Sequence, residues 1–167
     1  NDGDKASISI KGSSVLASAK NKATVDVDSN GGNGTQVLVQ NASVKAHAKG
    51  GDKQSNEALV NVEADNDIRL NGATIEARAE KAGWRQVARV NLDAGDDVRY
   101  VSADNDGTSS TISALAGSLH NKPNHSEATI DVHAKQHVDL WSDLTAVAKA
   151  KDNAASPTGE QLQLANV

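Results

Sequence analysis

The chain has 167 residues, a formal net charge of −5, and no cysteine, phenylalanine or methionine. It therefore cannot form a disulfide scaffold or a cysteine-ligated zinc site, and its mixture of acidic and basic residues disfavours nucleic acid as a partner. No apolar run approaches the roughly 20 residues of a membrane-spanning helix, and the aliphatic, aromatic-poor composition predicts a thin interior instead of a thick core.

An internal repeat is the clearest feature of the sequence. Segment 68–79, Ile-Arg-Leu-Asn-Gly-Ala-Thr-Ile-Glu-Ala-Arg-Ala, is matched without a gap by segments 8–19 and 37–48. A fourth copy begins at Val98 and carries a seven-residue insertion, and a fifth begins at Val138 with one deletion. The copies begin 29, 31, 30 and 40 residues apart. A regular period of about 30 residues predicts stacked supersecondary units.

Apolar residues recur at every second position within each unit, which is the pattern of strands. The segment 76–82 is rich in alanine and glutamate, which favour helix, but its alanines recur two apart in every copy, so we expect strand there. In chain order the predicted strands cover 8–10, 15–19, 23–27, 37–39, 44–48, 58–62, 68–70, 75–79, 88–92, 98–100, 112–116, 128–132, 138–140 and 144–148, and a further one opens within 161–167.

Three short strands per unit predict an all-β fold, a right-handed parallel β-helix of about five coils, with residues 1–167 as a single solenoid segment. Equivalent side chains of successive coils should form inner columns about 4.8 Å apart. Three of the predicted columns are the following: Val25, Val60, Val90 and Ile130; Ile8, Val37, Ile68, Val98 and Val138; and Val15, Val44, Ile75, Ile112 and Leu144. Paired alanines, from Ala17 and Ala19 to Ala146 and Ala148, should mark a narrow corner.

Polar residues between the apolar ones should form columns on the outside. We expect one outer column to contain Asp26, Asn61, Asn91 and Asp131, and another to contain Arg69, Arg99 and Asp139. The stacked amides of Asn61 and Asn91 should share hydrogen bonds. Arg99 and Asp139 should form an exposed ion pair worth roughly 0–1 kcal/mol.

The reiterated strand, Asn or Gly, strand and Ala-x-Ala units resemble a known family. They look like the repetitive β-helical region of filamentous-haemagglutinin-like exoproteins, the adhesins exported by two-partner secretion, and are similar to repeats of long biofilm-matrix adhesins. The resemblance extends over essentially the whole chain, and no catalytic or binding motif is part of it. It implies a structural stalk or spacer of an adhesin that is secreted to the bacterial cell surface and attaches cells to hosts, to matrix polysaccharide or to one another.

The ends of the chain lead to a further expectation. The chain begins within the equivalent of a middle strand, and 161–167 resembles the opening strand of another coil. We see neither a secretion domain of that family nor the polar cap that a terminal coil needs. We therefore expect an internal fragment of a longer protein, whose neighbouring repeats are its first partners.

Acidic turns and histidines are the candidate metal ligands of the sequence. Asp65-Asn66-Asp67, Asp96-Asp97 and 104–107 supply oxygen atoms for Ca²⁺, but Asp, Asn and Gly are also ordinary turn formers. No loop has the complete Asp-x-Asp-x-Asp-Gly pattern with a distal Glu, so we expect no cofactor. The histidines are expected to lie outward on strands (His47, His133), in a turn (His137), or in a loop spanning 117–127 (His120, His125), without forming a metal site.

We expect no enzymatic activity, although some polysaccharide lyases and hydrolases are β-helices. Such enzymes need acids and bases that converge in an outer groove, with carboxylates roughly 5–10 Å apart in the hydrolases. The candidates here are Asp26, Asp131, Asp139, Arg69 and Arg99, residue types that a solvated outer face contains in any case.

The alternative function is recognition of carbohydrate or protein through insertion loops, which solenoids often gather on one face. The insertions run over about 29–35, 101–111, 117–127 and 152–160. Exposed tryptophan is a common contact residue, although a tryptophan that covers a corner of the solenoid is the structural alternative. The candidate contact residues are Trp84, Trp141, His120 and His125.

Overall fold

A computed structural model describes residues 7–32, 34–50, 55–80, 85–100, 109–117, 125–149 and 163–167. In these ranges the regular secondary structure is entirely β-strand, in three parallel sheets of five strands each. Sheet A contains β1 (Ile8–Lys11), β4 (Gln36–Gln40), β7 (Asp67–Asn71), β10 (Asp97–Tyr100) and β13 (His137–Asp139). Sheet B contains β2 (Ser14–Ala19), β5 (Ser43–Lys49), β8 (Thr74–Glu80), β11 (Ser110–Gly117) and β14 (Ser142–Lys149). Sheet C contains β3 (Lys22–Ser29), β6 (Asn56–Ala64), β9 (Arg85–Ala94), β12 (His125–Ala134) and β15 (Gln163–Asn166).

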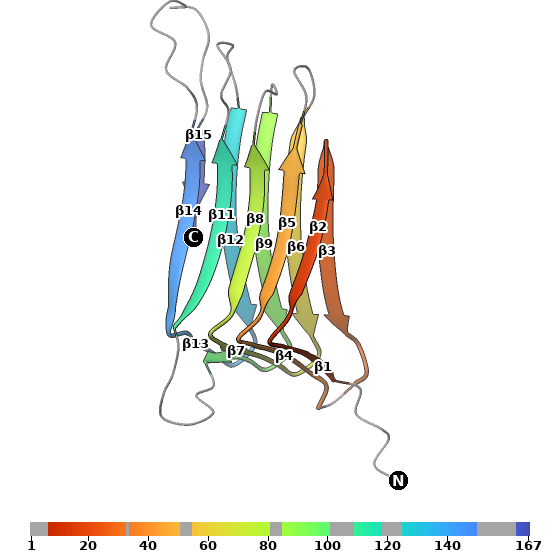
Figure 1. Ribbon diagram of the computed structural model, residues 1–167. Coiled ribbons are helices and arrows are strands. Elements are labelled where there is room, and N and C mark those ends of the chain that lie inside the picture. The colour runs from red at the N-terminus through yellow and green to blue at the C-terminus, as the bar shows by residue number, and fades with distance from the viewer. Residues whose placement is uncertain are drawn as a thin grey trace, which may run out of the picture.

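The chain winds through the three sheets as a right-handed solenoid. Figure 1 shows it rising through sheet B, descending behind it through sheet C, and returning along the short base formed by sheet A as it advances from the red to the blue end. Each coil supplies one strand to each sheet, so neighbouring strands of a sheet belong to successive coils. The predicted parallel β-helix is confirmed. No described helix is long and apolar enough to cross a membrane.

The strand registers confirm the predicted columns. In sheet C, Val25 pairs with Val60, Val60 with Val90, and Val90 with Ile130. The columns of sheets A and B that begin at Ile8 and Val15 follow the predicted order through Val138 and Leu144. The gapless repeat predicts the register because a slip of one residue would turn every apolar side chain to the outside.

Alanine fills the corner where sheets B and C converge. Ala77 and Ala79 lie near the end of β8, Ala88 lies near the start of β9, and all three are fully buried. β8 ends and β9 begins at the upper edge of Figure 1, and the two strands are in contact. Small side chains allow this approach, so the predicted narrow corner is present.

A buried polar column lies beyond the alanines at this same corner. Asn56, Gln86 and Ser126 are fully buried and occupy equivalent register positions. Asn56 Nδ2 donates hydrogen bonds to Gln86 Oε1 at 3.0 Å and to the Glu80 carbonyl oxygen at 3.4 Å. The amide of Asn56 lies against Gly50, where an added Cβ would come 1.6 Å from Asn56 Oδ1.

The backbone conformation explains why Asn or Gly recurs at one position of the repeat. Gly12, Asn41 and Gly72 lie at the same turn between sheets A and B, and their φ angles are 55°, 46° and 56°. Left-handed backbone is accessible to glycine and tolerated by asparagine better than by most residues. The repeat therefore has these residues where the chain turns sharply from one wall to the next.

Three local predictions are wrong. His125 begins strand β12 and does not lie in a loop, and His137 begins strand β13 and does not lie in a turn. The insertions are also shorter than predicted, because Ser29 belongs to β3, 110–117 to β11, and 125–127 to β12. Pairing with the neighbouring coil extends these strands beyond the apolar positions from which their ends were predicted.

Candidate functional site

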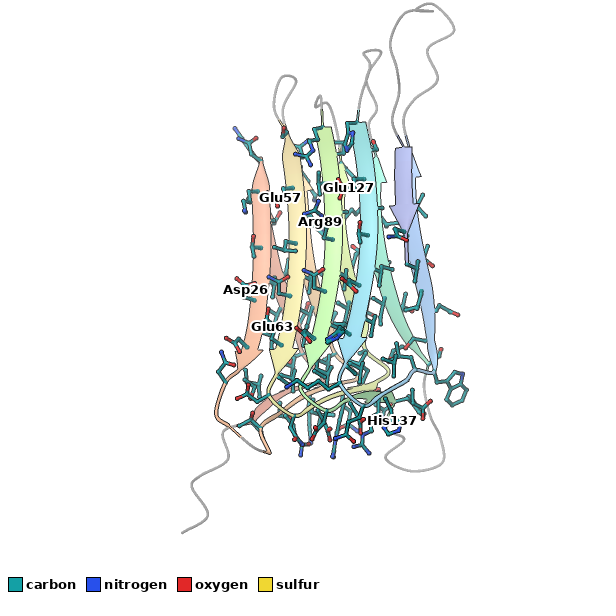
Figure 2. The ribbon with its side chains drawn as sticks, turned by 180° about the vertical axis from the view of Figure 1, so that it is seen from behind. Asp26, Glu57, Glu63, Arg89, Glu127 and His137 are labelled. Atoms are coloured by element: carbon teal, nitrogen blue, oxygen red, sulfur yellow. The ribbon has the colours of Figure 1, made fainter. Side chains whose placement is uncertain are left out.

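The lower half of the outer face of sheet C is rich in carboxylates. Successive outer columns place Asp26 beside Asn61, Asn61 beside Asn91, and Asn91 beside Asp131. The next column contains Asp28, Glu63, Asp93 and His133. We call the following six residues the acidic strip: Asp26, Asp28, Glu63, Asp65, Asp93 and Asp131. Figure 2 shows Asp26 and Glu63 on this face, below Glu57, Arg89 and Glu127.

Two adjoining hollows lie over the acidic strip. One has a volume of about 320 Å³ and is lined by Asp26, Val27, Asp28, Asn61 and Glu63. The other has a volume of about 180 Å³ and is lined by Asn30, Glu63, Ala64, Asp65, Asp93, Ala94, Gly95 and Lys135. Glu63 lines both hollows, which therefore follow the strip across successive coils.

Asp26 and Asp93 of the strip have hydrogen-bonding partners within the protein. Asn61 Nδ2 donates a hydrogen bond to Asp26 Oδ1 at 2.7 Å. Asn91 Nδ2 donates to Asn61 Oδ1 at 2.9 Å, which confirms the predicted sharing of amide hydrogen bonds. Asp93 Oδ1 lies 2.9 Å from His133 Nδ1.

The strip lacks the geometry of a chelating metal site. Over the described ranges, three or more His, Asp or Glu side chains do not converge closely enough to hold a metal ion. Successive coils hold equivalent side chains about 4.8 Å apart, so the carboxylates are spread along a column instead of meeting at one point. The strip can attract cations through its combined charge.

Above the strip, Glu127 lies among the side chains of Arg89, Arg85 and His125. Arg89 donates to Glu127 Oε1 through Nε at 3.1 Å and through the terminal nitrogen Nη2 at 2.5 Å. Arg85 Nη2 lies 3.6 Å and His125 Nε2 lies 3.5 Å from Glu127 Oε2. The hydrogen bonds from Arg89 hold the pKa of Glu127 below its ordinary value against the opposing effect of burial, and the charge of Arg89, a hydrogen bond from His125 and the charge of Arg85 lower the pKa further. This carboxyl group is therefore a poor proton donor.

The acidic turns that could supply calcium ligands are held by side chains of the same strand and by groups of adjacent coils. Asp67 Oδ2 accepts a hydrogen bond from Arg69 Nη2 at 2.9 Å. Asp97 forms an ion pair with Arg99 and accepts a hydrogen bond from the backbone N–H of His137 at 3.0 Å. Asp65 Oδ2 accepts from the backbone N–H of Gly32 at 2.8 Å, and Asp96 Oδ1 accepts from Gln136 Nε2 at 2.9 Å. The turn at 104–107 lies outside the described residues.

The predicted pairing of Arg99 with Asp139 is replaced by another arrangement. The two residues are register partners, as predicted. However, Arg99 Nη2 lies 3.5 Å from Asp67 Oδ1 and also contacts Asp97. Asp97 precedes Arg99 by two residues and shares its face of the strand, and this nearly buried carboxylate has more to gain from a cation than the exposed Asp139.

Of the four predicted contact residues, Trp141 and His125 lie within the described part of the chain. Trp141 is 56% exposed, and its ring meets that of Tyr100 edge to face, with ring centres 5.1 Å apart. His125 lies on sheet C in the Glu127 cluster, whereas Trp141 lies between β13 and β14. Trp84 and His120 fall outside the described residues. The structure therefore does not bring Trp141 and His125 together in one site.

The polar residues considered for catalysis lie on two different walls. Asp26 and Asp131 share one column of sheet C but are separated by three coil spacings, or roughly 14 Å. Arg69, Arg99 and Asp139 lie together in a column of sheet A. His137, which Figure 2 places at the base, is also on sheet A.

Sequence reasoning missed the Glu127 cluster and the extent of the acidic strip. The aligned Ala-x-Val and Ala-x-Ile blocks already place Glu127 beside Val87 and Arg89 beside Thr129. Because long side chains reach diagonal neighbours in a sheet, this register was the available signal for the cluster. Glu63, Asp93 and His133 follow the last apolar residue of each block, which was the signal for the strip.

The chain matches no known protein-family model, no curated protein and no solved structure.

Proposed function

We propose that this chain is a structural spacer of a bacterial adhesin that is secreted to the cell surface, with no catalytic activity of its own. In this role it extends the protein by stacking coils and attaches to neighbouring repeats of the same protein. The adhesive contacts with host, matrix polysaccharide or other cells are made elsewhere in that protein.

The continuous inner columns are the observation that carries the proposal. Val37, Ile68 and Val98 are each fully buried, and each lies in register with the next. Aliphatic columns of this kind stabilise a straight rod through contacts between adjacent coils, and each added coil of about 30 residues lengthens the rod by about 4.8 Å. A rod that grows by addition of like units is well suited to hold a binding domain away from a cell surface.

The chemistry of the outer face supports the same role. Asp67, Asp97 and Glu127 are engaged by arginines, and the Arg99–Asp67 and Arg89–Glu127 pairs join neighbouring strands. The carboxylates of Asp26 and Asp131 are too far apart for the paired chemistry of a glycoside hydrolase. The proposal therefore assigns no reaction to this chain.

Binding and activity assays on the purified 167-residue chain test the proposal. A spacer should bind no component of an array of glycans and extracellular-matrix proteins above the level of a control protein of equal charge. It should release neither reducing nor unsaturated sugar ends from bacterial and host polysaccharides. Saturable binding, or release of sugar ends that depends on Asp26 or Asp131, would contradict the spacer function.

A second candidate function, recognition of carbohydrate or protein, is favoured by Trp141. Its ring is more than half exposed and packs against Tyr100 with the two ring planes nearly perpendicular, and an exposed aromatic ring that is held in place can contact a sugar or an apolar side chain. Saturable glycan binding that is lost in Trp141→Ala and retained in Leu16→Ala, a change at another exposed apolar residue, would establish this function. Equal binding by both variants would exclude Trp141 as the contact.

A further inference from the structure

Two Asn-Gly pairs lie wholly within the described residues, and their surroundings differ. Asn30-Gly31 follows strand β3, and Asn71-Gly72 begins at the last residue of strand β7. Such a pair is chemically reactive, because glycine has no Cβ to shield its backbone nitrogen, and that nitrogen can attack the side-chain amide of the preceding asparagine. How fast the attack proceeds depends on how firmly the surrounding structure holds the pair.

The surroundings of Asn30-Gly31 leave the pair open to this attack. Both residues are exposed, and neither belongs to a strand. Among the described residues the Gly31 N–H has no hydrogen-bond acceptor, whereas the next N–H, that of Gly32, donates to Asp65 Oδ2 at 2.8 Å. Asn30 Nδ2 donates to Asp28 Oδ2 at 2.8 Å, so the amide nitrogen that must leave is held at the surface, beside a carboxylate.

The surroundings of Asn71-Gly72 protect that pair. Asn71 is only 7% exposed and is the register partner of Gln40 in β4. Its carbonyl oxygen accepts a hydrogen bond from the Asn41 N–H at 2.8 Å. Attack requires the asparagine to rotate out of extended backbone until its side chain reaches the next nitrogen. At this site the rotation would break hydrogen bonds between adjacent coils.

We propose that Asn30 is a site of self-modification, at which the side-chain amide is converted to aspartate and isoaspartate with water as the only co-reactant. The Gly31 nitrogen loses its proton to solvent and bonds to Asn30 Cγ. The bond from Cγ to Nδ2 then breaks, and Nδ2 takes up a proton and leaves as ammonia. Water opens the resulting cyclic imide at either carbonyl group. The net change consumes one water and releases one ammonia, without oxidation or reduction.

The product changes the acidic strip. Asn30 lines the smaller hollow together with the carboxylates of Glu63, Asp65 and Asp93, so the reaction adds a further negative charge there. It also replaces the N–H donor that Asp28 accepts with a like charge, and the isoaspartate product lengthens the backbone of this loop by one carbon. The strip therefore becomes more acidic as the protein ages. The reaction is confined to the chain itself, and the inference does not depend on the adhesin function.

Peptide mass spectrometry of the full chain tests the proposal. The chain is incubated for increasing times at mildly alkaline pH and then digested with trypsin, which places Asn30 in peptide 23–45 and Asn71 in peptide 70–78. Fragment ions should locate the exchange of amide for carboxylate at Asn30. Incubation in water labelled with heavy oxygen identifies carboxylate formed before digestion. Asn71 should react roughly 10- to 100-fold more slowly, because its reaction must first break buried hydrogen bonds.

Two comparisons separate the effect of the fold from that of the local sequence. In concentrated urea, where the fold is lost, Asn30 and Asn71 should react at similar rates. Gly31→Ala keeps Asn30 but shields the attacking nitrogen, so it should slow the reaction at Asn30 in the folded and the unfolded chain alike; circular dichroism verifies that this variant folds. Equal rates at the two asparagines in the folded chain would overturn the proposal. So would a folded chain in which Asn30 stays unmodified while the unfolded chain reacts, or a rate at Asn30 that Gly31→Ala leaves unchanged.

Discussion

The inner columns make a quantitative prediction at Ile75, in the middle of the sheet B wall. Ile75 lies between Val44 and Ile112, and all three side chains are fully buried. Ile75→Ala removes three carbon atoms, which costs about 2.4 kcal/mol at about 0.8 kcal/mol for each. The backbone ladders hold the neighbouring side chains about 4.8 Å apart, so the cavity cannot close fully, and we expect a total loss of about 3–4 kcal/mol.

Leu144→Ala is the matched control in the same column. Leu144 pairs with Ile112 on one side and is 38% exposed, so much of its surface already meets water. We expect this substitution to cost about 1 kcal/mol.

Urea unfolding followed by circular dichroism measures both variants. The midpoint should fall much further for Ile75→Ala than for Leu144→Ala, with similar slopes, so that the difference reports stability. Equal losses at the two positions would refute the reasoning, because they would mean that burial within a continuous column does not determine stability.

Two further substitutions, one of them with a matched control, test the turn between β9 and β10 and the cluster around Glu127. Gly95→Ala should destabilise the protein by about 3 kcal/mol in urea unfolding, since an added Cβ would lie 1.8 Å from the Asp65 carbonyl oxygen and displace backbone. Gly117→Ala is the control, because its added Cβ meets nothing within 4 Å, and it should change stability by less than about 0.5 kcal/mol. A similar cost at both glycines would contradict the close approach of Gly95 to the Asp65 backbone. Glu127→Gln should cost about 1–2 kcal/mol at neutral pH, because it removes the charge that the Arg89 side chain binds. Hydrogen bonding from Arg89 lowers the pKa of Glu127 in the folded state. The extra free energy of unfolding of the wild type over Glu127→Gln should therefore be complete above the unfolded-state pKa of this group and should vanish as pH falls through the folded-state pKa. A difference in stability that does not change with pH would exclude the ion pair as its source.

The sequence predicted the architecture because the repeated spacing of apolar residues determines it. The copies that begin at Ile8, Val37 and Ile68 align without gaps, so their apolar positions specify both the inner face and the register. The alanine pairs likewise predicted the narrow corner. A repeated pattern is informative in this way because each coil faces the same packing problem as its neighbours.

Side-chain pairing was harder to predict because it depends on competition between neighbours. Arg99 has Asp139 beside it in the register, yet it contacts Asp97 and Asp67. The buried column led by Asn56 and Gln86 was also missed, because polar residues at inward positions resemble loop residues in a sequence. Strand ends at Gly117 and His125 were placed wrongly because inter-coil hydrogen bonds, and not apolar alternation, decide where pairing stops.

In-register stacking of successive coils is tested most directly by cysteine cross-linking, since the chain has no cysteine of its own. Ser14 and Ser43 lie on adjacent strands with their Oγ atoms 2.7 Å apart, a spacing that suits a disulfide. Ser14→Cys with Ser43→Cys should form an intramolecular disulfide rapidly under mild oxidation at low protein concentration. Ser14→Cys with Thr74→Cys, two coils apart at roughly 9.6 Å, should not. Equal rates for the two pairs, or preference for the second, would contradict the stacked solenoid.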